Sequence, residues 1–407
     1  MAGYWRTVGL VLSGTALAQA IPILGSLVIA RLFIPEEFGV FTAWLGIATI
    51  AGVFVTGRLE MALALEGDGA PRRRAAAAVL ATTAAGILAL SGVYACSRMW
   101  LSAPAGMPSS LEVLLVPTVA VLALAQIMQA WSAAEGAFRL LSLMRIVQAM
   151  LVTGLQIGAG LLVPSAESLA LGHVAGVAIA ALVGLFSLKP KLSGIPLTTA
   201  MRQLYRSYYR FPLFSLPADT LNTAATQLPL IIVTSRFGAD VGGYLALGMR
   251  TVGAPISLLG TAVLDVFKRS ASESWRAVGN ARDIYRHTFL VLAAASTVAT
   301  LIFMLIGEQL FAVAFGESWR EAGRIAIWLL PMFALRFVAS PLSYMFYLAQ
   351  KQHEDLLWQV TLFVGTLIAM TQLPDYPSTL QTYAWGYGAL YVVYIGMSYR
   401  ASLGAPR

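Results

Sequence analysis

Apolar runs of about twenty residues, each nearly free of charge, recur along the whole chain. A run of that length crosses the hydrocarbon core of a bilayer when it forms an α-helix. Charged residues make up only 11% of the 407 residues, whereas ordinary soluble proteins have about 25%. Because so little charge cannot cover a water-exposed surface, the composition excludes a cytosolic enzyme, a disordered tail and a collagen-like chain.

The spacing of the apolar runs predicts an all-α integral membrane protein with many spans, and the mean hydropathy of +0.75 agrees with this. Helices that cross the membrane are expected to have these bounds, read from windows of about 20 residues: 8–31, 38–57, 75–97, 111–134, 144–163, 167–187, 211–235, 241–266, 286–306, 323–348, 356–373 and 380–399. The sequence therefore predicts twelve transmembrane helices.

The 27 Lys and Arg residues indicate how these helices are oriented. With twelve spans, most of the basic residues fall in loops on the same side of the membrane as both termini. Lys and Arg collect in cytoplasmic loops, so the N and C termini are both predicted to be cytoplasmic. A net charge of +8 would suggest a nucleic acid partner only if the basic residues clustered on one face, and their scatter along the chain excludes that partner.

A polar, basic segment at residues 188–210 separates six predicted spans from the other six. We therefore expect an N-terminal six-helix bundle at 1–187, a cytoplasmic linker at 188–210 and a C-terminal six-helix bundle at 211–407. A weak internal repeat supports the division, because Arg31 and Gly39 in the first half resemble Arg236 and Gly243 in the second. Two bundles of equal topology are one arrangement found in secondary transporters.

Several short motifs occur in a characteristic order. They are IPEEFGVF at Ile34–Phe41, GRLEMAL at Gly57–Leu63, RFPLF at Arg210–Phe214, VGGYLAL at Val241–Leu247 and GESWREAG at Gly316–Gly323. Through these motifs the chain resembles bacterial polysaccharide-exporter flippases, which translocate O-antigen and exopolysaccharide repeat units and belong to the multidrug/oligosaccharidyl-lipid/polysaccharide (MOP) superfamily.

The resemblance implies a function, a location and partners. The substrate would be an oligosaccharide linked to a polyprenyl diphosphate, moved from the cytoplasmic to the outer leaflet of the bacterial inner membrane by alternating access. Surface polysaccharides, including the O-antigen part of lipopolysaccharide, would be assembled from it. The partners would be the lipid-linked oligosaccharide, membrane lipid, and a polysaccharide polymerase with other assembly proteins.

Arg250 is the clearest basic residue inside a predicted span. A charge inside the bilayer is costly unless it faces protein or water, and a guanidinium matches phosphate oxygens in a bidentate fork. Arg250 is therefore a candidate ligand for the substrate diphosphate. The alternative is a structural ion pair, with Asp219 as the expected partner.

Arg58 and Glu60 lie at the cytoplasmic end of the second predicted span, and Arg31 lies at the outer end of the first. Two residues apart, Arg58 and Glu60 would point to different faces of a continuous helix. Arg58 is a candidate for contact with the substrate headgroup and Glu60 for an inner gate, although both also fit a purely structural role. Arg31 is a candidate for an outer gate, and its alternative is extension of the side chain to the lipid headgroups.

Two further features fit a polar cavity. Arg336 lies in the tenth predicted span between Pro331 and Pro341, which predict a broken helix whose free carbonyl groups need protein or water. Asn222 and Asp219 belong to a polar stripe on the seventh predicted span, which suits sugar hydroxyls or, equally, hydrogen bonds between helices. Polar glutamines such as Gln126 favour ordinary packing.

Small residues recur at helical spacing in two predicted spans. They are Gly172, Gly176, Ala180 and Gly184 in the sixth span and Gly154 and Gly158 in the fifth. Both stripes predict close packing of helices.

The sequence lacks the features of the main enzyme alternatives. A membrane polysaccharide polymerase or ligase needs catalytic groups outside the lipid, and the acidic residues of the short outer loops form no paired motif. We find no phosphate-binding glycine loop for ATP, and the single cysteine, Cys96, supports neither a disulfide nor a metal site. We therefore expect a transporter without enzymatic activity, without a metal and without a cofactor, with a coupling cation left open. Two rivals remain, a drug exporter of the same superfamily and a flippase for the peptidoglycan precursor.

Overall fold

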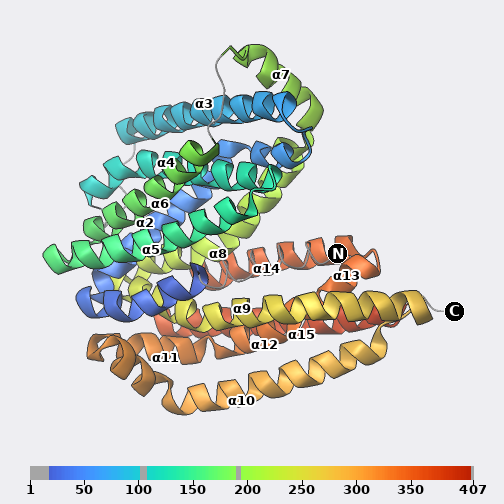
Figure 1. Cartoon of the computed structure of the whole chain (residues 1–407). Coiled ribbons are helices and arrows are strands. Elements are labelled where there is room, and N and C mark those ends of the chain that lie inside the picture. The colour runs from blue at the N-terminus through green and yellow to red at the C-terminus, as the bar shows by residue number, and fades with distance from the viewer. Residues whose placement is uncertain (1–17, 101–107, 189–193, 405–407) are drawn as a thin grey trace. The chain divides into compact units, whose positions relative to one another are not determined.

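The described part of the protein is built from α-helices and short turns. A computed structural model describes residues 18–100, 108–188 and 194–404 (Figure 1), and none of these residues lies in a β-strand. This confirms the predicted all-α class. Residues 8–17 of the first predicted span and 189–193 of the predicted linker lie outside the described residues.

The helices follow one another with short connections. A first described helix runs over Ala18–Leu32. The others, with the 3₁₀- and π-helices labelled η, are α2 (Pro35–Thr56), η1 (Leu59–Ala64), α3 (Ala70–Trp100), α4 (Ser109–Ala134), α5 (Phe138–Leu162), α6 (Ala166–Leu188), α7 (Leu197–Tyr208), η2 (Phe211–Ser215), α8 (Leu216–Phe237), α9 (Ala239–Val278), α10 (Arg282–Phe315), η3 (Glu317–Trp319), α11 (Arg320–Trp328), α12 (Leu330–Leu342), α13 (Tyr344–Leu348), α14 (Gln352–Gln372) and α15 (Tyr376–Ser402).

The described helices identify a multi-pass membrane protein. Six of them, α2 to α6 and α10, are long and apolar enough to cross a bilayer, and a bent pair of helices in the range 317–348 adds a seventh. Each predicted span overlaps a described helix, but α8, α9 and α15 carry polar or charged residues that reduce their apolar character. The count of twelve spans and the cytoplasmic placement of both termini stay predictions.

The chain divides into two compact units, Met1–Gly242 and Gly243–Arg407. In the first unit α5 packs along α6, α3 packs against α7, and α8 packs along α2. In the second unit α12 packs along α15 and α10 packs against α11 and α12. Contacts thus assign α8 to the first unit, whereas the sequence assigned its residues to a second bundle at 211–407; the grouping into six and six spans stays a prediction.

Within the predicted linker the chain forms α7, a helix that the polar composition concealed. Ala200 and Leu204 are buried on one face of α7 and join the core made by α3 and η1. These residues are four apart, the spacing of one face of an α-helix. The remaining residues of α7 are mostly exposed, so α7 is an amphipathic helix that lies on α3.

Small residues let α5 and α6 approach closely. A Cβ atom at Gly172 would lie 2.8 Å from the backbone nitrogen of Gln156, and one at Gly176 would lie 2.5 Å from that of Val152. Backbones come this near only where a side chain is missing. The small-residue stripe predicted on α6 is therefore confirmed at these two positions. The same expectation for Gly154 and Gly158 of α5 was wrong, since a Cβ at either position would meet nothing within 4 Å.

The tenth predicted span is broken, as its prolines indicated. The segments 317–328 and 330–348 meet at an angle of 55°, directly before Pro331. A proline has no N–H to continue the helix ladder, and its ring displaces the carbonyl of the preceding turn. The span is interrupted again after Pro341, because α12 ends at Leu342 and the short α13 follows.

Candidate functional site

A sharp turn at the end of α2 positions the first candidate site. Gly57 ends the helix in the left-handed conformation with φ of 59°, and Arg58 follows with φ of 56°. Among the described residues, the only other non-glycine residue with a positive φ is Gln350. This backbone region costs an ordinary residue about 1 kcal/mol or more, so the surrounding contacts must hold Arg58 in place.

The guanidinium of Arg58 lies between two carboxylates. Its Nε donates to Oδ2 of Asp219 at 2.6 Å, and its Nη1 donates to Oε1 of Glu60 at 3.1 Å. The same Glu60 oxygen accepts a hydrogen bond of 2.6 Å from the side-chain amide of Gln126 on α4. Exposure differs across this cluster: the side chain of Glu60 is 3% exposed, that of Arg58 22% and that of Asp219 37%. We refer to Arg58, Glu60, Asp219 and Gln126 as the Arg58 cluster.

The Arg58 cluster corrects three expectations from the sequence. Arg58 and Glu60 do not point apart, because the helix stops at Gly57 and the chain continues as the 3₁₀-helix η1. Asp219, the partner that the alternative interpretation gave to Arg250, is bound by Arg58. Gln126 is not a simple packing residue, since its amide binds a buried carboxylate.

The ion pair between Arg58 and Asp219 lies at one end of a long contact between α2 and α8. A Cβ at Gly46 would lie 3.3 Å from the side chains of both Gln227 and Ile231, about three turns from the Arg58 end. Arg58, after the end of α2, thus contacts Asp219 near the start of α8, while Gly46, earlier in α2, contacts Ile231 later in α8. The two helices therefore run antiparallel. Asn222, the other predicted sugar ligand on α8, is exposed one helical turn from Asp219.

A second arginine supports the turn and was missed by the sequence reasoning. Arg72 of α3 is buried and donates to the carbonyl oxygens of Leu63 and Glu66, both at 3.0 Å. It also pairs with Asp68 at 2.7 Å and with Glu135 at 3.4 Å. Arg72 thereby fixes the end of η1 to α3 and α4. Its position in a run of three arginines gave no signal of this role.

The Tyr208 hydroxyl at the end of α7 lies near Glu66, which follows η1. Burial and, next, the charge of Glu66 raise the pKa of Tyr208 above its ordinary value. This places the end of α7 near the residues that follow η1. The linker helix therefore packs next to the segment that carries Arg58 and Glu60.

At the other end of α2, an acidic residue of the first turn has a structural partner. The carboxylate of Glu37 accepts a hydrogen bond of 2.6 Å from the backbone N–H of Ala166, in the first turn of α6. A carboxylate there satisfies a free helix N–H group. Arg31 is exposed at the end of the helix Ala18–Leu32. Its predicted role in an outer gate stays a prediction.

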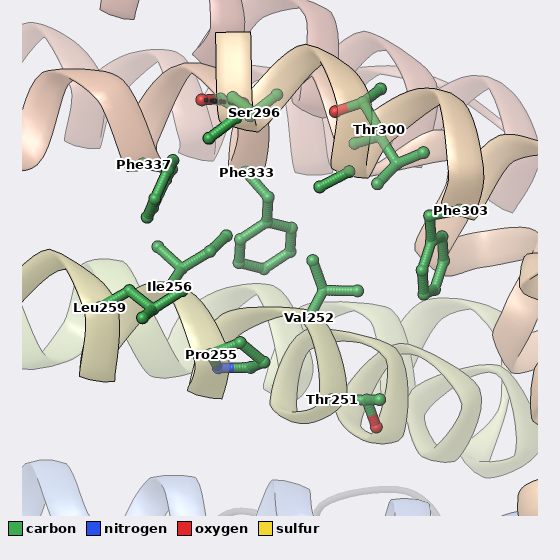
Figure 2. Close-up of a pocket in the computed structure, with 14 residues that line it drawn as sticks. Thr251, Val252, Pro255, Ile256, Leu259, Ser296, Thr300, Phe303, Phe333 and Phe337 are labelled. Atoms are coloured by element: carbon green, nitrogen blue, oxygen red, sulfur yellow. Dashed lines mark hydrogen bonds between the residues drawn. The ribbon is translucent and has the colours of Figure 1, made fainter. Parts of the chain in front are cut away.

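In the second unit, Arg250 lies on α9, half-buried and directly before the wall of a pocket. The pocket has a volume of about 270 Å³ and is formed by α9, α10 and α12 (Figure 2). Val252, Ile256 and Leu259 of α9 face Phe303, Phe333 and Phe337 across it. The hydroxyl of Ser296 donates to the carbonyl of Ala334 at 2.9 Å, so the pocket wall is mainly apolar.

Arg336 also belongs to the second unit and is exposed on α12. It interacts electrostatically with three tyrosines of α15, Tyr383, Tyr387 and Tyr391. The rings of these tyrosines form a ladder with centroid separations of 5.3 and 5.4 Å. The sequence predicted that Arg336 lies in a broken span. It gave no sign that tyrosines of α15 surround this arginine.

Among the described residues no group of three or more His, Cys, Asp or Glu side chains could hold a metal ion. Charged residues at the end of α10 and in η3 and α11 pair with each other. Arg320 binds Glu317 at 2.5 Å, and Arg324 binds Glu308 at 3.1 Å and Glu321 at 2.9 Å. These pairs connect the end of α10 to η3 and α11.

Comparison with known proteins gives the family and the fold. Residues 28–324 match the model of a family described as "Polysaccharide biosynthesis protein". No curated protein sequence matches significantly.

Solved structures with a similar fold share little sequence. The lipid II flippase MurJ in an inward closed conformation has a TM-score of 0.74 at 13% identity, over 96% of this chain and 87% of that one. An inward-facing multidrug resistance MATE family transporter of the MOP superfamily has a TM-score of 0.66 at 15% identity, over 95% of both chains. A MOP superfamily transporter from Pyrococcus furiosus Vc1, reported to have a binding pocket of reversed polarity, has a TM-score of 0.54 at 14% identity, over 97% and 94%. The chain therefore has the fold of MOP superfamily transporters.

Proposed function

The chain belongs to the polysaccharide biosynthesis protein family, and from this premise we propose that it is a flippase for oligosaccharides linked to a polyprenyl diphosphate. It would move these repeat units from the cytoplasmic to the outer leaflet of a bacterial inner membrane. The products would enter the assembly of a surface polysaccharide such as O-antigen or exopolysaccharide, with a polymerase and other assembly proteins as partners.

The Arg58 cluster is the observation that carries the proposal. Arg58 is partly exposed and is held by two carboxylates in a turn that keeps its guanidinium available at the end of α2. A diphosphate offers several oxygens in the geometry that a guanidinium binds best. Exchange of a carboxylate for a diphosphate oxygen would give Arg58 a new partner and open the contact between α2 and α8.

The pocket in the second unit supports a lipid-linked substrate. A cavity of about 150 Å³ holds a benzene ring, so 270 Å³ accommodates one or two isoprene units. We propose that a segment of the isoprenoid chain of the substrate enters this pocket. Arg250 precedes the pocket residue Thr251 on α9, which places a positive charge at the head of an apolar wall.

The mechanism we propose is alternating access. The cytoplasmic state would load the diphosphate at Arg58, and the outward state would release it where the membrane potential favours the movement of negative charge out of the cell. The polar residues Asp219 and Asn222 of α8 would contact the sugars, with Arg336 and Arg250 as further binding residues. Arg31 and Glu60 would act as outer and inner gate residues.

The rival functions differ in cargo or in chemistry. A drug exporter of the same superfamily would transport organic cations, which call for an acidic site, whereas Arg250 and Arg336, which lie deep in predicted spans, are cationic. A peptidoglycan-precursor flippase would also need cationic residues and differs in the glycan. A polymerase or ligase would form a new glycosidic bond. A metal or other cofactor has no part in the proposed mechanism.

Deletion of the protein in its host tests the assignment. Lipid-linked repeat units are labelled from the outer face with a reagent that cannot cross the membrane, before and after the gene is returned. We expect repeat units to accumulate unlabelled in the deletion strain and to be labelled after complementation. Unchanged labelling in the deletion strain would refute the flippase. Loss of labelled peptidoglycan precursor, or new sensitivity to cationic drugs, would instead identify one of the rivals.

A further inference from the structure

The linker helix α7 carries a row of arginines on the face that points away from the protein core. Ala200 and Leu204 hold one face of α7 against α3 (Figure 1). Arg202 and Arg206 each follow one of these residues by two positions, which places them on the opposite face of the helix. Arg210 continues the spacing of four, since the backbone stays in the helical region there. All three arginines are exposed and form one cationic row.

The protein itself does not neutralise this row. The segment 188–210 contains five Lys and Arg residues and no Asp or Glu. Neither Arg202 nor Arg206 forms an ion pair with a carboxylate in the described part of the chain. The guanidinium of Arg210 lies 6.0 Å from the centre of the Tyr209 ring. The row therefore calls for an anionic partner outside the chain.

An aromatic row lies beside the arginines. Tyr205 and Tyr209 are also four residues apart, and their side chains are 40% and 52% exposed. Leu213 and Phe214 of η2, at 57% and 64%, continue the exposed apolar surface. Tyrosine is enriched where a membrane meets water, because its ring is apolar and its hydroxyl is polar. A cationic row next to a tyrosine row fits the headgroup region of a bilayer.

The contact with α3 places α7 at the level of the headgroups. Ala200 and Leu204 belong to the same core cluster as residues 75, 76, 78 and 79 of α3. These residues open the apolar part of a helix that is long enough to cross a bilayer, and the exposed Arg73 and Arg74 directly precede them. Because the apolar run begins here, α7 lies on the membrane-surface end of a transmembrane helix. The sequence predicts that this end is cytoplasmic.

We propose that the exposed face of α7 binds the headgroups of anionic phospholipids. Arg202, Arg206 and Arg210 donate hydrogen bonds to lipid phosphates, which a guanidinium matches well. Tyr205 and Tyr209 lie against the glycerol region of the same lipids. Basic residues on an amphipathic helix next to a transmembrane helix bind the anionic surface of a membrane in this way. Bound lipid holds α7 on α3 and stabilises the first unit.

The length of the row favours a lipid surface over a single soluble anion. Arg202 and Arg210 are eight residues apart, which is about 12 Å along a helix that rises by about 1.5 Å per residue. A row of that length meets several headgroups side by side, whereas one phosphate reaches only one guanidinium or two. The inference goes beyond the proposed function and does not depend on it.

The first test uses the wild-type, full-length protein, so that it does not depend on the folding of a variant. Hydrogen exchange is compared in lipid nanodiscs of phosphatidylcholine and in nanodiscs that also contain phosphatidylglycerol. We expect the amides of α7 to exchange more slowly with phosphatidylglycerol, because a ligand of the folded state makes local opening rarer. Equal exchange in the two kinds of disc would overturn the lipid site.

The segment 269–276 of α9 is the internal reference for this measurement. It is also basic, but Arg269 pairs with Glu273 and Arg276 donates to the carbonyl oxygen of Ser272, all within the same helix. It corrects for the lower surface pH of anionic discs, which slows exchange without binding. A slowing that is equal in α7 and in this reference would also contradict the proposal.

The second test removes two charges from the row. The variant Arg202→Gln with Arg206→Gln is compared with Arg269→Gln with Arg276→Gln, which loses the same charge elsewhere. Native mass spectrometry in a neutral detergent measures binding of phosphatidylglycerol. The α7 variant should bind about 30-fold more weakly, or about fivefold for each basic residue near an anionic surface, and should lose the slower exchange. The control should bind as the wild type does. Wild-type affinity in the α7 variant would refute the site.

Two further outcomes define what the site is. Glycerol phosphate added to phosphatidylcholine discs should leave the exchange of α7 unchanged, and protection by it would replace the lipid surface with a soluble anion site. Flipping of lipid-linked sugars together with unchanged exchange would leave the flippase and remove the lipid site. Protection of α7 in a protein that flips no such sugar would leave the lipid site and remove the flippase.

Discussion

The Nε atom of Arg58 lies 2.6 Å from Oδ2 of Asp219, and this ion pair closes one end of the contact between α2 and α8. Both side chains are partly exposed, so solvent screens the pair and an anionic ligand can compete for it. The same guanidinium reaches the buried Glu60. Opening the pair would therefore change the partner of a buried charge as well as the contact between two helices.

Arg58→Gln should slow flipping by about 30-fold, which corresponds to roughly 2 kcal/mol for a lost charge-assisted hydrogen bond. Arg58→Lys should lose less, because it keeps the charge but not the bidentate fork. Rates are measured with a lipid-linked oligosaccharide in reconstituted vesicles. Arg269→Gln is the control, since Arg269 is exposed and pairs within its own helix. Equal rates for Arg58→Gln and the control would contradict the role of Arg58.

Asp219→Asn should weaken the closed contact between α2 and α8. Because Asp219 is more than a third exposed, the cost in stability should be small, about 1 kcal/mol or less. The effect should shrink at high salt, since exposed charges are screened. Thermal unfolding in detergent at low and high salt measures both. A large loss of stability that does not depend on salt would show that the residue acts through packing instead.

Gly176→Ala should destabilise the first unit by about 2 kcal/mol, because its Cβ would collide with the backbone of Val152 and force the helices apart. Gly158→Ala on α5 is the matched control: a Cβ there meets nothing within 4 Å, and alanine favours the helix by about 1 kcal/mol. The two variants should therefore shift the unfolding temperature in opposite directions. Equal shifts would contradict the close packing of α5 and α6.

Ala334→Phe should fill the apolar pocket of the second unit. Ala334 lines the pocket, so the larger ring would remove the space proposed for the isoprenoid chain and weaken binding of farnesyl diphosphate by about tenfold, or ~1.4 kcal/mol. Ala294→Phe is the control, because Ala294 is exposed on α10 and does not line the pocket. Calorimetry gives both affinities, and unchanged binding by Ala334→Phe would exclude the pocket as the tail site.

The stability of the first turn of α15 should depend on pH, because Asp375 caps this helix. Its carboxylate accepts from the backbone N–H of Ser378 at 2.8 Å, and this hydrogen bond lowers the pKa of Asp375 below its ordinary value of 3.8. The stability that this hydrogen bond gives the folded state is therefore fully present above the ordinary pKa of Asp375 and is lost as the pH falls through the lowered pKa. Hydrogen exchange in the first turn of α15, corrected for its intrinsic rate, should speed up at that low pH. Asp375→Ala should show the faster exchange at neutral pH, whereas Asp375→Asn should remain capped.

The sequence was informative where one physical effect dominated. Long apolar runs predicted the helices, because in lipid a helix satisfies its own backbone. Pro331 predicted the break in the tenth span, and the spacing of Gly172 and Gly176 predicted a close approach of helices. Ala200 and Leu204 of α7 carried a helical spacing that the polar composition of the linker hid.

The Arg58 cluster could be predicted only in part. Arg58, Glu60 and Asp219 were recognised as candidates because charge is costly within a membrane. Their grouping depends on a left-handed turn at Gly57 and Arg58 and on the antiparallel packing of α2 with α8. Residues 58 and 219 are joined only by tertiary structure, so local spacing contained no sign of this pair. Gln126 and Arg72 were missed for the same reason.

The role of Arg58 in flipping is measured most directly in vesicles that contain only the purified protein and a polyprenyl-diphosphate oligosaccharide with a fluorescent sugar. A membrane-impermeant quencher reports the fraction of sugars in the outer leaflet over time. We expect rapid exchange of the sugars between leaflets in wild-type vesicles and in Arg269→Gln vesicles, and slow exchange in Arg58→Gln vesicles. A wild-type rate no faster than that of protein-free vesicles would contradict the proposed flippase.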